Sequence, residues 1–194
     1  MQSTEIGHFV IKAYGNEFSL IPSLENMSKL ADPKGLIRIY NLIHSKGAPI
    51  NILVDLARQI ILTCSSSDEI GDYLVWIKRG KPQLKKRMLS MNDQVAIAAG
   101  LMRHGIAGVN RPKMKGDKKK GKALDKFDVN RIVADIMVNF NMSRKEALQL
   151  TMSEIYQLIG AANRPDEQDA DLPSVDEHIS LMERIKQASE EGAK

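Results

Sequence analysis

The stretch whose residue types come nearest to a catalytic motif is GDKKKGKA, residues 116–123. Its spacing matches G-x-x-x-x-G-K, the loop that cradles nucleotide phosphates, but that loop continues with a Ser or Thr whose hydroxyl holds Mg²⁺. Ala123 occupies that position, and the preceding residues, NRPKMK, do not predict a buried strand. We therefore interpret the stretch as a basic loop and expect no nucleotide chemistry from it.

Histidine and cysteine are placed in ways that do not predict a metal site or a nucleophile. His8, His44, His104 and His178 fall in separate predicted elements, and no H-E-x-x-H or Cys-His spacing occurs. We expect His104 to interact with the last carbonyls of a helix, and Cys64 to be a small buried hydrophobic residue. No G-x-S-x-G nucleophile turn is present. The sequence thus predicts no metal, no cofactor and no enzymatic activity.

Basic residues are concentrated in one part of the chain. Residues 78–122 contain 14 Lys or Arg and 2 Asp or Glu, a net charge of +12. Part of this is a candidate binding segment, which we call the basic segment: Arg111, Lys113, Lys115, Lys118, Lys119, Lys120 and Lys122. Such a density of cations can neutralise phosphates, so a nucleic-acid-binding accessory protein using residues 78–122 is one alternative. Interleaved aromatic residues and zinc-ligand spacing, which would indicate base recognition, are missing.

The C-terminal part has the opposite charge. Residues 163–194 carry 4 basic and 9 acidic side chains, a net charge of −5. We predict an acidic linker followed by an amphipathic helix that begins at the capping box Ser174-x-x-Glu177. Its narrow apolar stripe suits docking onto a partner or onto its own domain, and its candidate binding residues are Ile179, Met182 and Ile185. The expected domains are a helical domain at 1–162 and this tail at 163–194.

Composition and patterning favour a mainly α fold that is built to position these residues. Of 194 residues 43% are hydrophobic, yet only 4 Phe, 4 Tyr and 1 Trp are present beside 10 Met, which predicts an aliphatic, methionine-rich core. Cys64 has no partner for an internal disulfide. The N-terminus lacks the pattern of a secretory signal, and the longest apolar stretch, 50–62, is broken by polar residues. We therefore expect a cytoplasmic protein without a membrane segment.

One β-hairpin is predicted, at residues 6–21. Apolar residues alternate before and after Gly15-Asn16, a pair that fits the two central residues of a tight turn. Helical signals follow: Ser23 and Asp32-Pro33 are typical helix starts. Between residues 50 and 61 one helical stripe is predicted, made of Ile50, Leu53, Val54, Ala57, Ile60 and Ile61.

Further helices are expected beyond this stripe. Ser65 to Ser67 predict the start of a helix that holds Ile70, Leu74 and Ile77 and is broken by residues 78–82. The pattern predicts another over residues 92–104, which Gly105 ends, and then an inserted lysine-rich loop over 105–125. A helical stripe resumes over residues 129–140.

Two capping boxes in series give the most specific boundaries. They are Ser143-x-x-Glu146 and Thr151-x-x-Glu154, in which the hydroxyl accepts from a backbone N–H three residues on and the Glu reaches back. The helix after the second box carries an apolar stripe of Ile155, Leu158 and Ile159. We consider this stripe a docking surface or, as is more common for such stripes, part of the core.

Three stretches together resemble a known protein family. Residues 139–161, NFNMSRKEALQLTMSEIYQLIGA, resemble the C-terminal signature of the tail assembly chaperones of tailed bacteriophages, a short helix, a Ser-capped turn and a second helix. The predicted hairpin and residues 18–30, FSLIPSLENMSKL, are similar to that family's opening. Residues 91–108, MNDQVAIAAGLMRHGIAG, are similar to a helix ending in His-Gly in related phage proteins. The lysine-rich insert at 113–122 is not part of the pattern.

The resemblance implies a non-enzymatic protein of the infected bacterium's cytoplasm. It would bind the tape measure protein, keep that long helical chain soluble, help tail tube protein polymerise around it, and be absent from the finished virion. Aliphatic, Met-rich helices suit adaptable grooves of modest affinity, and the opposite charges of the two segments suit self-association. A structural minor tail protein is a third possibility, distinguished by its presence in finished particles.

Overall fold

The computed structural model describes residues 2–3, 6–109 and 126–162. Described residues up to Gly160 belong to one compact unit. The basic segment, most of the predicted lysine-rich loop and the whole predicted tail at 163–194 lie outside the described residues, so these predictions keep the status of predictions.

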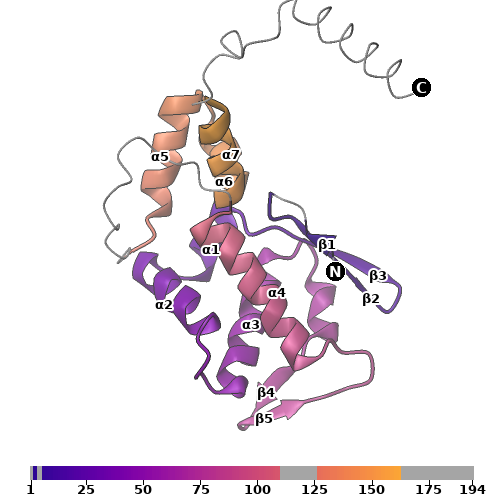
Figure 1. The fold of residues 1–194 in the computed structure, drawn as a ribbon. Helices are drawn as coiled ribbons and strands as arrows, with labels where there is room; N and C mark the ends of the chain where they lie inside the picture. Colours follow the sequence, from indigo (N-terminus) through magenta and orange to yellow (C-terminus); the bar gives the residue numbers. More distant parts are fainter. Residues whose placement is uncertain (1, 4–5, 110–125, 163–194) are drawn as a thin grey trace, which may run out of the picture. The chain divides into compact units, whose positions relative to one another are not determined.

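The fold is mainly α with a short N-terminal hairpin, as the sequence predicts. The helices are α1 (Leu24–Leu30), α2 (Pro33–Ile43), α3 (Ile50–Cys64), α4 (Met91–Met102), α5 (Val129–Phe140), α6 (Arg144–Gln149) and α7 (Met152–Ala162). A 3-10 helix (Asp68–Tyr73) follows α3, and a π-helical turn (Arg103–Ala107) follows α4. In Figure 1 the hairpin of strands β4 and β5 lies at the lower end and α5 to α7 at the upper end.

The N-terminal hairpin is confirmed, with its turn one residue earlier than predicted. β2 (Phe9–Ala13) pairs antiparallel with β3 (Asn16–Leu20), and β1 (Gln2–Ser3) adds a third strand on the other side of β2. Ala13 pairs with Asn16, so the central turn residues are Tyr14 and Gly15, with φ of 50° and 91°. This is the type I′ geometry, in which both central residues need positive φ and glycine is favoured at the second.

The predicted helix starts are confirmed in atomic detail. Ser23 Oγ accepts from Asn26 N at 3.2 Å, and an Asp32 carboxylate oxygen accepts from Gly35 N at 2.9 Å. At the first capping box, Glu146 accepts from the Ser143 hydroxyl and backbone N–H, which lowers the pKa of the Glu146 carboxyl. These caps satisfy N–H groups that have no partner inside the helix.

The second capping box is also present. The Glu154 carboxylate accepts from Thr151 N at 2.7 Å, and Thr151 Oγ1 accepts from Glu154 N at 3.2 Å. Thr151 Oγ1 also donates to the Ile6 carbonyl at 2.6 Å, and the residue is fully buried. Thr151 therefore caps the start of α7 and also joins it to the segment between β1 and β2.

A second hairpin replaces the helix that we predicted through Ile77. After the 3-10 helix the chain forms β4 (Trp76–Lys78) and β5 (Lys81–Gln83), paired antiparallel with Ile77 opposite Pro82. The turn residues Arg79 and Gly80 have φ of 52° and 73°. Residues that we interpreted as helix breakers thus form a tight β-turn and its flanking strand residues. Pro82 cannot donate a hydrogen bond to a neighbouring strand, so its presence argued against predicting a strand here.

The helix over residues 91–102 also ends differently from the prediction. Gly105 does not stop it, because a π-helical turn carries the chain on to Ala107, and Gly105 is buried against Pro22 and Met27. Gly108, with φ of 69°, is the residue that ends the helical structure. The first residues of the predicted loop at 105–125, up to Ala107, are therefore helical.

The core is arranged around α3. One stripe of α3 is buried: Leu53, Val54, Ala57, Ile60, Ile61 and Cys64. This stripe packs on α1, α2 and α4, while Phe9, Ile11, Phe18 and Leu20 of the hairpin enter the same core. Ile50, which the sequence placed on the stripe, is instead exposed at the first position of the helix. No helix among the described residues is long and apolar enough to cross a membrane.

Candidate protein-docking groove

The side of α3 that does not face the core forms the floor of a groove. Asn51, Ile52, Asp55, Leu56 and Gln59 lie at i, i+1, i+4, i+5 and i+8, so they share one helical face. This face covers about 12 Å along the helix axis, at about 1.5 Å per residue. A strip of apolar and polar side chains two turns long therefore faces solvent.

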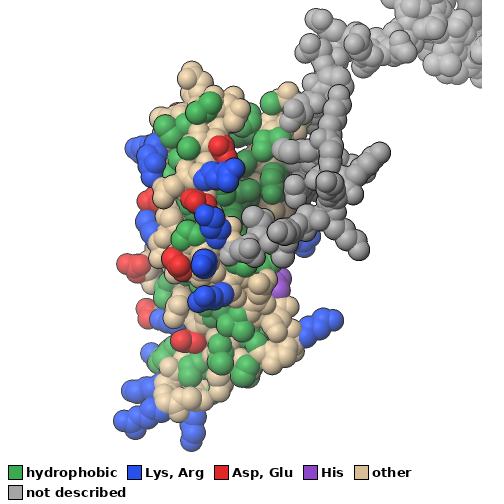
Figure 2. Space-filling view, turned by 90° about the vertical axis from the view of Figure 1, so that its left-hand side faces the viewer, with side chains coloured by type: hydrophobic (Ala, Val, Ile, Leu, Met, Phe, Trp, Pro, Cys, Tyr) green, Lys and Arg blue, Asp and Glu red, His purple; other side chains and the backbone are tan. Residues whose placement is uncertain are grey.

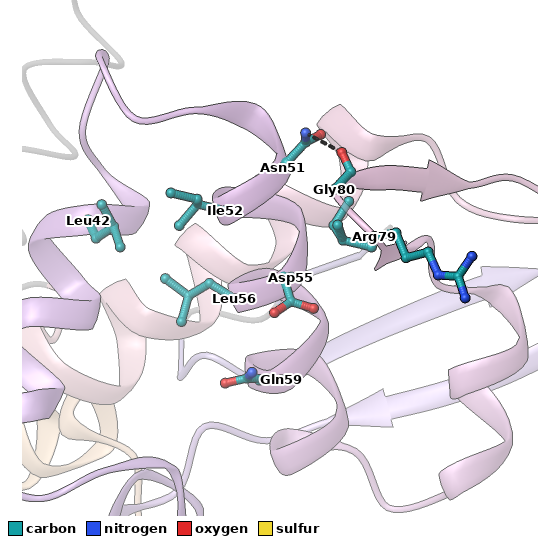
Figure 3. A pocket seen from close by; sticks show the side chains of 9 residues that line it. Leu42, Asn51, Ile52, Asp55, Leu56, Gln59, Arg79 and Gly80 are labelled. Carbon is teal, nitrogen blue, oxygen red and sulfur yellow. Dashed lines mark hydrogen bonds between the residues drawn. The ribbon is translucent and has the colours of Figure 1, made fainter.

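Walls on both sides turn this strip into a groove (Figure 3). Leu42, near the end of α2, stands on one side, and Ile77, Arg79 and Gly80 of the β4–β5 hairpin stand on the other. The groove is open to solvent and has a volume of about 490 Å³. We call this feature, lined by the nine residues named in this and the preceding paragraph, the docking groove.

Its apolar side chains are unusually exposed for their type. Ile52 is 50% exposed and Leu42 is 37% exposed, and Leu56 and Ile77 are half-buried. Figure 3 shows Ile52 and Leu56 extending from α3 toward the side on which Leu42 lies. Single exposed apolar residues are common on protein surfaces, but several gathered at one concave place are typical of interaction sites.

The hairpin wall is held in place by hydrogen bonds to α3. Asn51 Nδ2 donates to the Gly80 carbonyl at 2.9 Å, which attaches the tip of the hairpin to the first turn of the helix. Two turns further on, Arg58 Nη1 donates to the carbonyls of Gly71 and Leu74 at 2.9 and 3.1 Å, and its guanidinium lies 5.9 Å from the centre of the Trp76 ring. These contacts attach the turn of the hairpin, and the segment that leads into it, to α3.

Gln94 of α4 ties the base of the same wall to the core. Its side chain is fully buried and satisfied: Oε1 accepts from Val75 N at 2.9 Å, and Nε2 donates to the carbonyls of Val54 and Val75 at 2.9 and 3.0 Å. A buried amide with all its bonds made fixes the relative positions of the backbones it joins. Gln94 thus aligns α3, α4 and the residue that precedes β4.

Cations gather on and after the hairpin. Six basic side chains are exposed there: Lys78, Arg79, Lys81, Lys85, Lys86 and Arg87. None of them makes an ion pair in the described part of the chain, although Lys85 Nζ lies 4.9 Å from the centre of the Trp76 ring. Figure 2 shows blue side chains gathered at the lower end of the molecule, next to green ones. We call Lys78, Arg79 and Lys81, which belong to the hairpin itself, the cationic rim.

A second polar cluster lies where α7 begins, and it corrects the role expected of His104. Instead of capping a helix end, His104 Nδ1 lies 2.8 Å from Ser153 Oγ, which also accepts from Val109 N at 3.0 Å. Burial, and secondarily the charge of Arg103, lower the pKa of His104. Ser153 is fully buried, and its contact with His104 joins the π-helical turn to α7.

The site residues predicted from sequence are mostly elsewhere. Ile155 is buried in the core, and Leu158 and Ile159 are half-buried on α7, outside the docking groove. Ile179, Met182, Ile185 and the basic segment lie outside the described residues. Cys64 is buried as predicted, and burial raises the pKa of its thiol to about 12. In residues 6–109 and 126–162 no group of three metal-ligating side chains comes together.

Sequence reasoning missed the docking groove, although one signal for it was present. On α3 the apolar residues Ile52 and Leu56 lie off the buried stripe, four residues apart, so the helix has a second, weaker apolar face. A helix with two apolar faces is expected to contact something on each of them. The hairpin that forms one wall of the groove was not predicted, because we interpreted residues 78–82 as the end of a helix.

Comparison with known proteins gives one match. The model of a family described as "Family of unknown function (DUF6246)" matches residues 52–178, well over half of the chain. The matched part includes the α3 face from Ile52 onward and the β4–β5 hairpin. No curated protein and no solved structure matches the chain.

Proposed function

The chain belongs to the DUF6246 family of unknown function, a membership that specifies no activity, and from its surface and its sequence resemblance we propose that it is a protein-binding assembly factor, a tail assembly chaperone of a tailed bacteriophage. In this role it binds the tape measure protein in the cytoplasm of the infected bacterium, keeps that protein soluble and promotes polymerisation of the tail tube protein around it. The proposal includes self-association and no catalysis.

The observation that carries the proposal is the docking groove. A chaperone for an extended helical chain needs an accessible apolar surface that is concave and open, so that the bound segment is released when the next partner arrives. The exposed Ile52 and Leu42, held between α2 and the hairpin, supply such a surface. Its small size favours modest affinity per site, which suits a coat made of many copies.

The resemblance at residues 18–30, 91–108 and 139–161 adds the particular partner. Two of these stretches form structure of the kind on which the resemblance rests: a hairpin that leads into the Ser23-capped α1, and the Ser143-capped α6 followed by α7. Capped helices and hairpins also occur in many unrelated proteins. The choice of the tape measure protein as partner therefore depends on the experiment below.

Co-expression with a candidate tape measure protein from the same phage genome tests the proposal. We expect the tape measure protein to be insoluble alone, and to be soluble and co-purify when the chain described here is present, after nuclease treatment and at 0.15 M and 1 M salt. We also expect the chain to be absent from finished particles, which separates a chaperone from a minor tail protein. Failure to solubilise the tape measure protein would contradict the proposal.

Nucleic-acid binding is the second candidate, and it is favoured by the six exposed cations, which make no ion pair with any residue that the structure describes. Lys and Arg near phosphates release counterions, so this binding weakens steeply as salt rises. Nuclease-sensitive material that co-purifies at low salt and is lost at high salt, with no effect on the tape measure protein, would establish this candidate instead.

A further inference from the structure

The docking groove and the cationic rim lie side by side, and together they restrict what can bind. We propose that the groove binds a short amphipathic helix of a partner protein, with acidic residues along the edge of that helix that faces the β4–β5 hairpin. This inference rests on the proposed protein-binding function and names the chemistry of the segment that is bound.

The shape of the groove favours a helix over a strand. Its floor is a helical face about 12 Å long, which matches about two turns of a second helix lying in the groove. Strand addition needs a free edge with alternating N–H and C=O groups. The hairpin offers only three residues per strand, and Pro82 removes one donor from β5.

The charges around the groove define the edge of the bound helix. Lys78, Arg79 and Lys81 are exposed and make no ion pair with any described residue. Figure 3 shows the Arg79 guanidinium extending away from the apolar side chains. It can therefore contact an acidic residue at the edge of the groove, but not one over the floor. Asp55 is the one acidic lining residue, and it disfavours acidic residues placed directly over α3. The acidic residues of the ligand must therefore lie on the hairpin side.

The same charges argue against a second copy of this chain as the occupant. If two copies met symmetrically through this groove with the two-fold axis near the hairpin, the two cationic rims would approach each other, and like charges brought together across an interface are unfavourable. Nucleic acid would use the cations but would leave Ile52 and Leu42 without an apolar partner. An apolar helix with an acidic edge uses both sets of groups.

The test measures the affinity of the full-length protein for two designed, fluorescent helical peptides by anisotropy. Both have the same apolar stripe, and they differ only in whether Glu or Lys occupies the edge beside it. We expect the acidic peptide to bind about tenfold more tightly than the basic one, as three rim contacts of modest strength would give. Reversing the rim with Lys78→Glu, Arg79→Glu and Lys81→Glu should reverse this preference.

Matched variants separate charge from apolar contact. A control with the same net charge change, Lys34→Glu, Arg131→Glu and Lys145→Glu, reverses exposed cations on α2, α5 and α6, and should leave the preference unchanged. Leu42→Ser with Ile52→Ser should weaken both peptides, whereas Val138→Ser, which alters an apolar residue 84% exposed on α5, should weaken neither. All variants change exposed side chains, and circular dichroism checks their fold.

Several results would overturn the inference, and they differ from failure of the proposed function. Equal affinity for the two peptides would refute the acidic edge, and binding of neither would refute a helix in the groove. Competition by single-stranded oligonucleotide would make nucleic acid the occupant, and a dimer that Leu42→Ser with Ile52→Ser dissociates would make it a second copy. In each case the proposed function stands if the wild-type chain still solubilises the tape measure protein.

Discussion

At the scale of single residues, Gln94 has the greatest structural consequence for the groove. It is a buried polar residue in an otherwise apolar stripe of α4, and it makes three hydrogen bonds to the backbones of Val54 and Val75. Replacing it removes partners from buried backbone groups, which costs more than the loss of a bond exposed to water.

We predict that Gln94→Met lowers the free energy of unfolding by about 2–4 kcal/mol. The control is Gln157→Met on α7, where the side chain is exposed and the expected change is within about 0.5 kcal/mol. Urea unfolding measures both. Equal stability of the two variants would show that the Gln94 bonds do not hold the base of the hairpin wall.

His104 leads to a second prediction at this scale, for the pH dependence of stability. Burial disfavours the charged imidazolium in the folded protein and so lowers the pKa of His104. The unfolded chain then binds a proton at higher pH than the folded chain. The free energy of unfolding should therefore be unaffected by His104 above its ordinary pKa and fall as the pH drops through and below that value.

The measurement is urea unfolding at pH 7.5 and at pH 5.5. We expect His104→Gln to lose less stability than the wild type between these two values, whatever its stability at pH 7.5. His44→Gln is the control, because the His44 side chain is exposed. An unchanged difference between the two pH values in His104→Gln would contradict the account.

At the scale of elements, local signals were sufficient where a boundary depends on neighbours in the chain. Ser23, Asp32, Ser143 and Thr151 each cap a helix where the sequence predicted one, because capping bonds join residues three apart. The second hairpin depends on distant partners on α3: Asn51 donates to the carbonyl of Gly80 in its turn, and the guanidinium of Arg58 packs against Trp76 of β4. Periodicity within a short window does not contain that information.

The end of α4 likewise could not be predicted from neighbouring residues alone. Gly105 looked like a helix stop, but its backbone is buried against Met27 and Pro22, so close packing and not a helix end explains the glycine. Gly108 is the true end, where φ is 69° and an added Cβ would contact the ring of Tyr156 and lie 3.1 Å from the Met152 carbonyl. The two glycines are distinguished by tertiary packing, against Pro22 and Met27 at Gly105 and against α7 at Gly108.

We therefore predict that Gly108→Ala destabilises the protein more than Gly15→Ala. Both glycines have positive φ, which costs an alanine about 1–2 kcal/mol, but nothing lies within 4 Å of a Cβ added at Gly15. The contact with Tyr156 should add about 1–3 kcal/mol at Gly108. Thermal or urea unfolding compares the two variants, and equal losses would mean that α7 does not pack tightly on this turn.

At the scale of the whole molecule, the docking groove combines elements that are far apart in sequence: the end of α2, the outer face of α3 and the β4–β5 hairpin. Composition and patterning predicted the helical, methionine-rich character and the basic region at 78–122. They did not predict that exposed apolar residues and cations without an ion pair to any described residue would border the same groove, since that depends on how the hairpin folds back onto α3.

The most direct test of the central claim is the amount of soluble tape measure protein recovered on co-expression with groove variants. Ile52→Asp places a charge at the most exposed apolar position of the groove. We predict that this variant recovers much less soluble tape measure protein than the wild type. Val138→Asp makes the same kind of change on α5 and should leave recovery at the wild-type level. Equal recovery with both variants would show that the tape measure protein, if it is bound, does not use this groove, and would contradict the account.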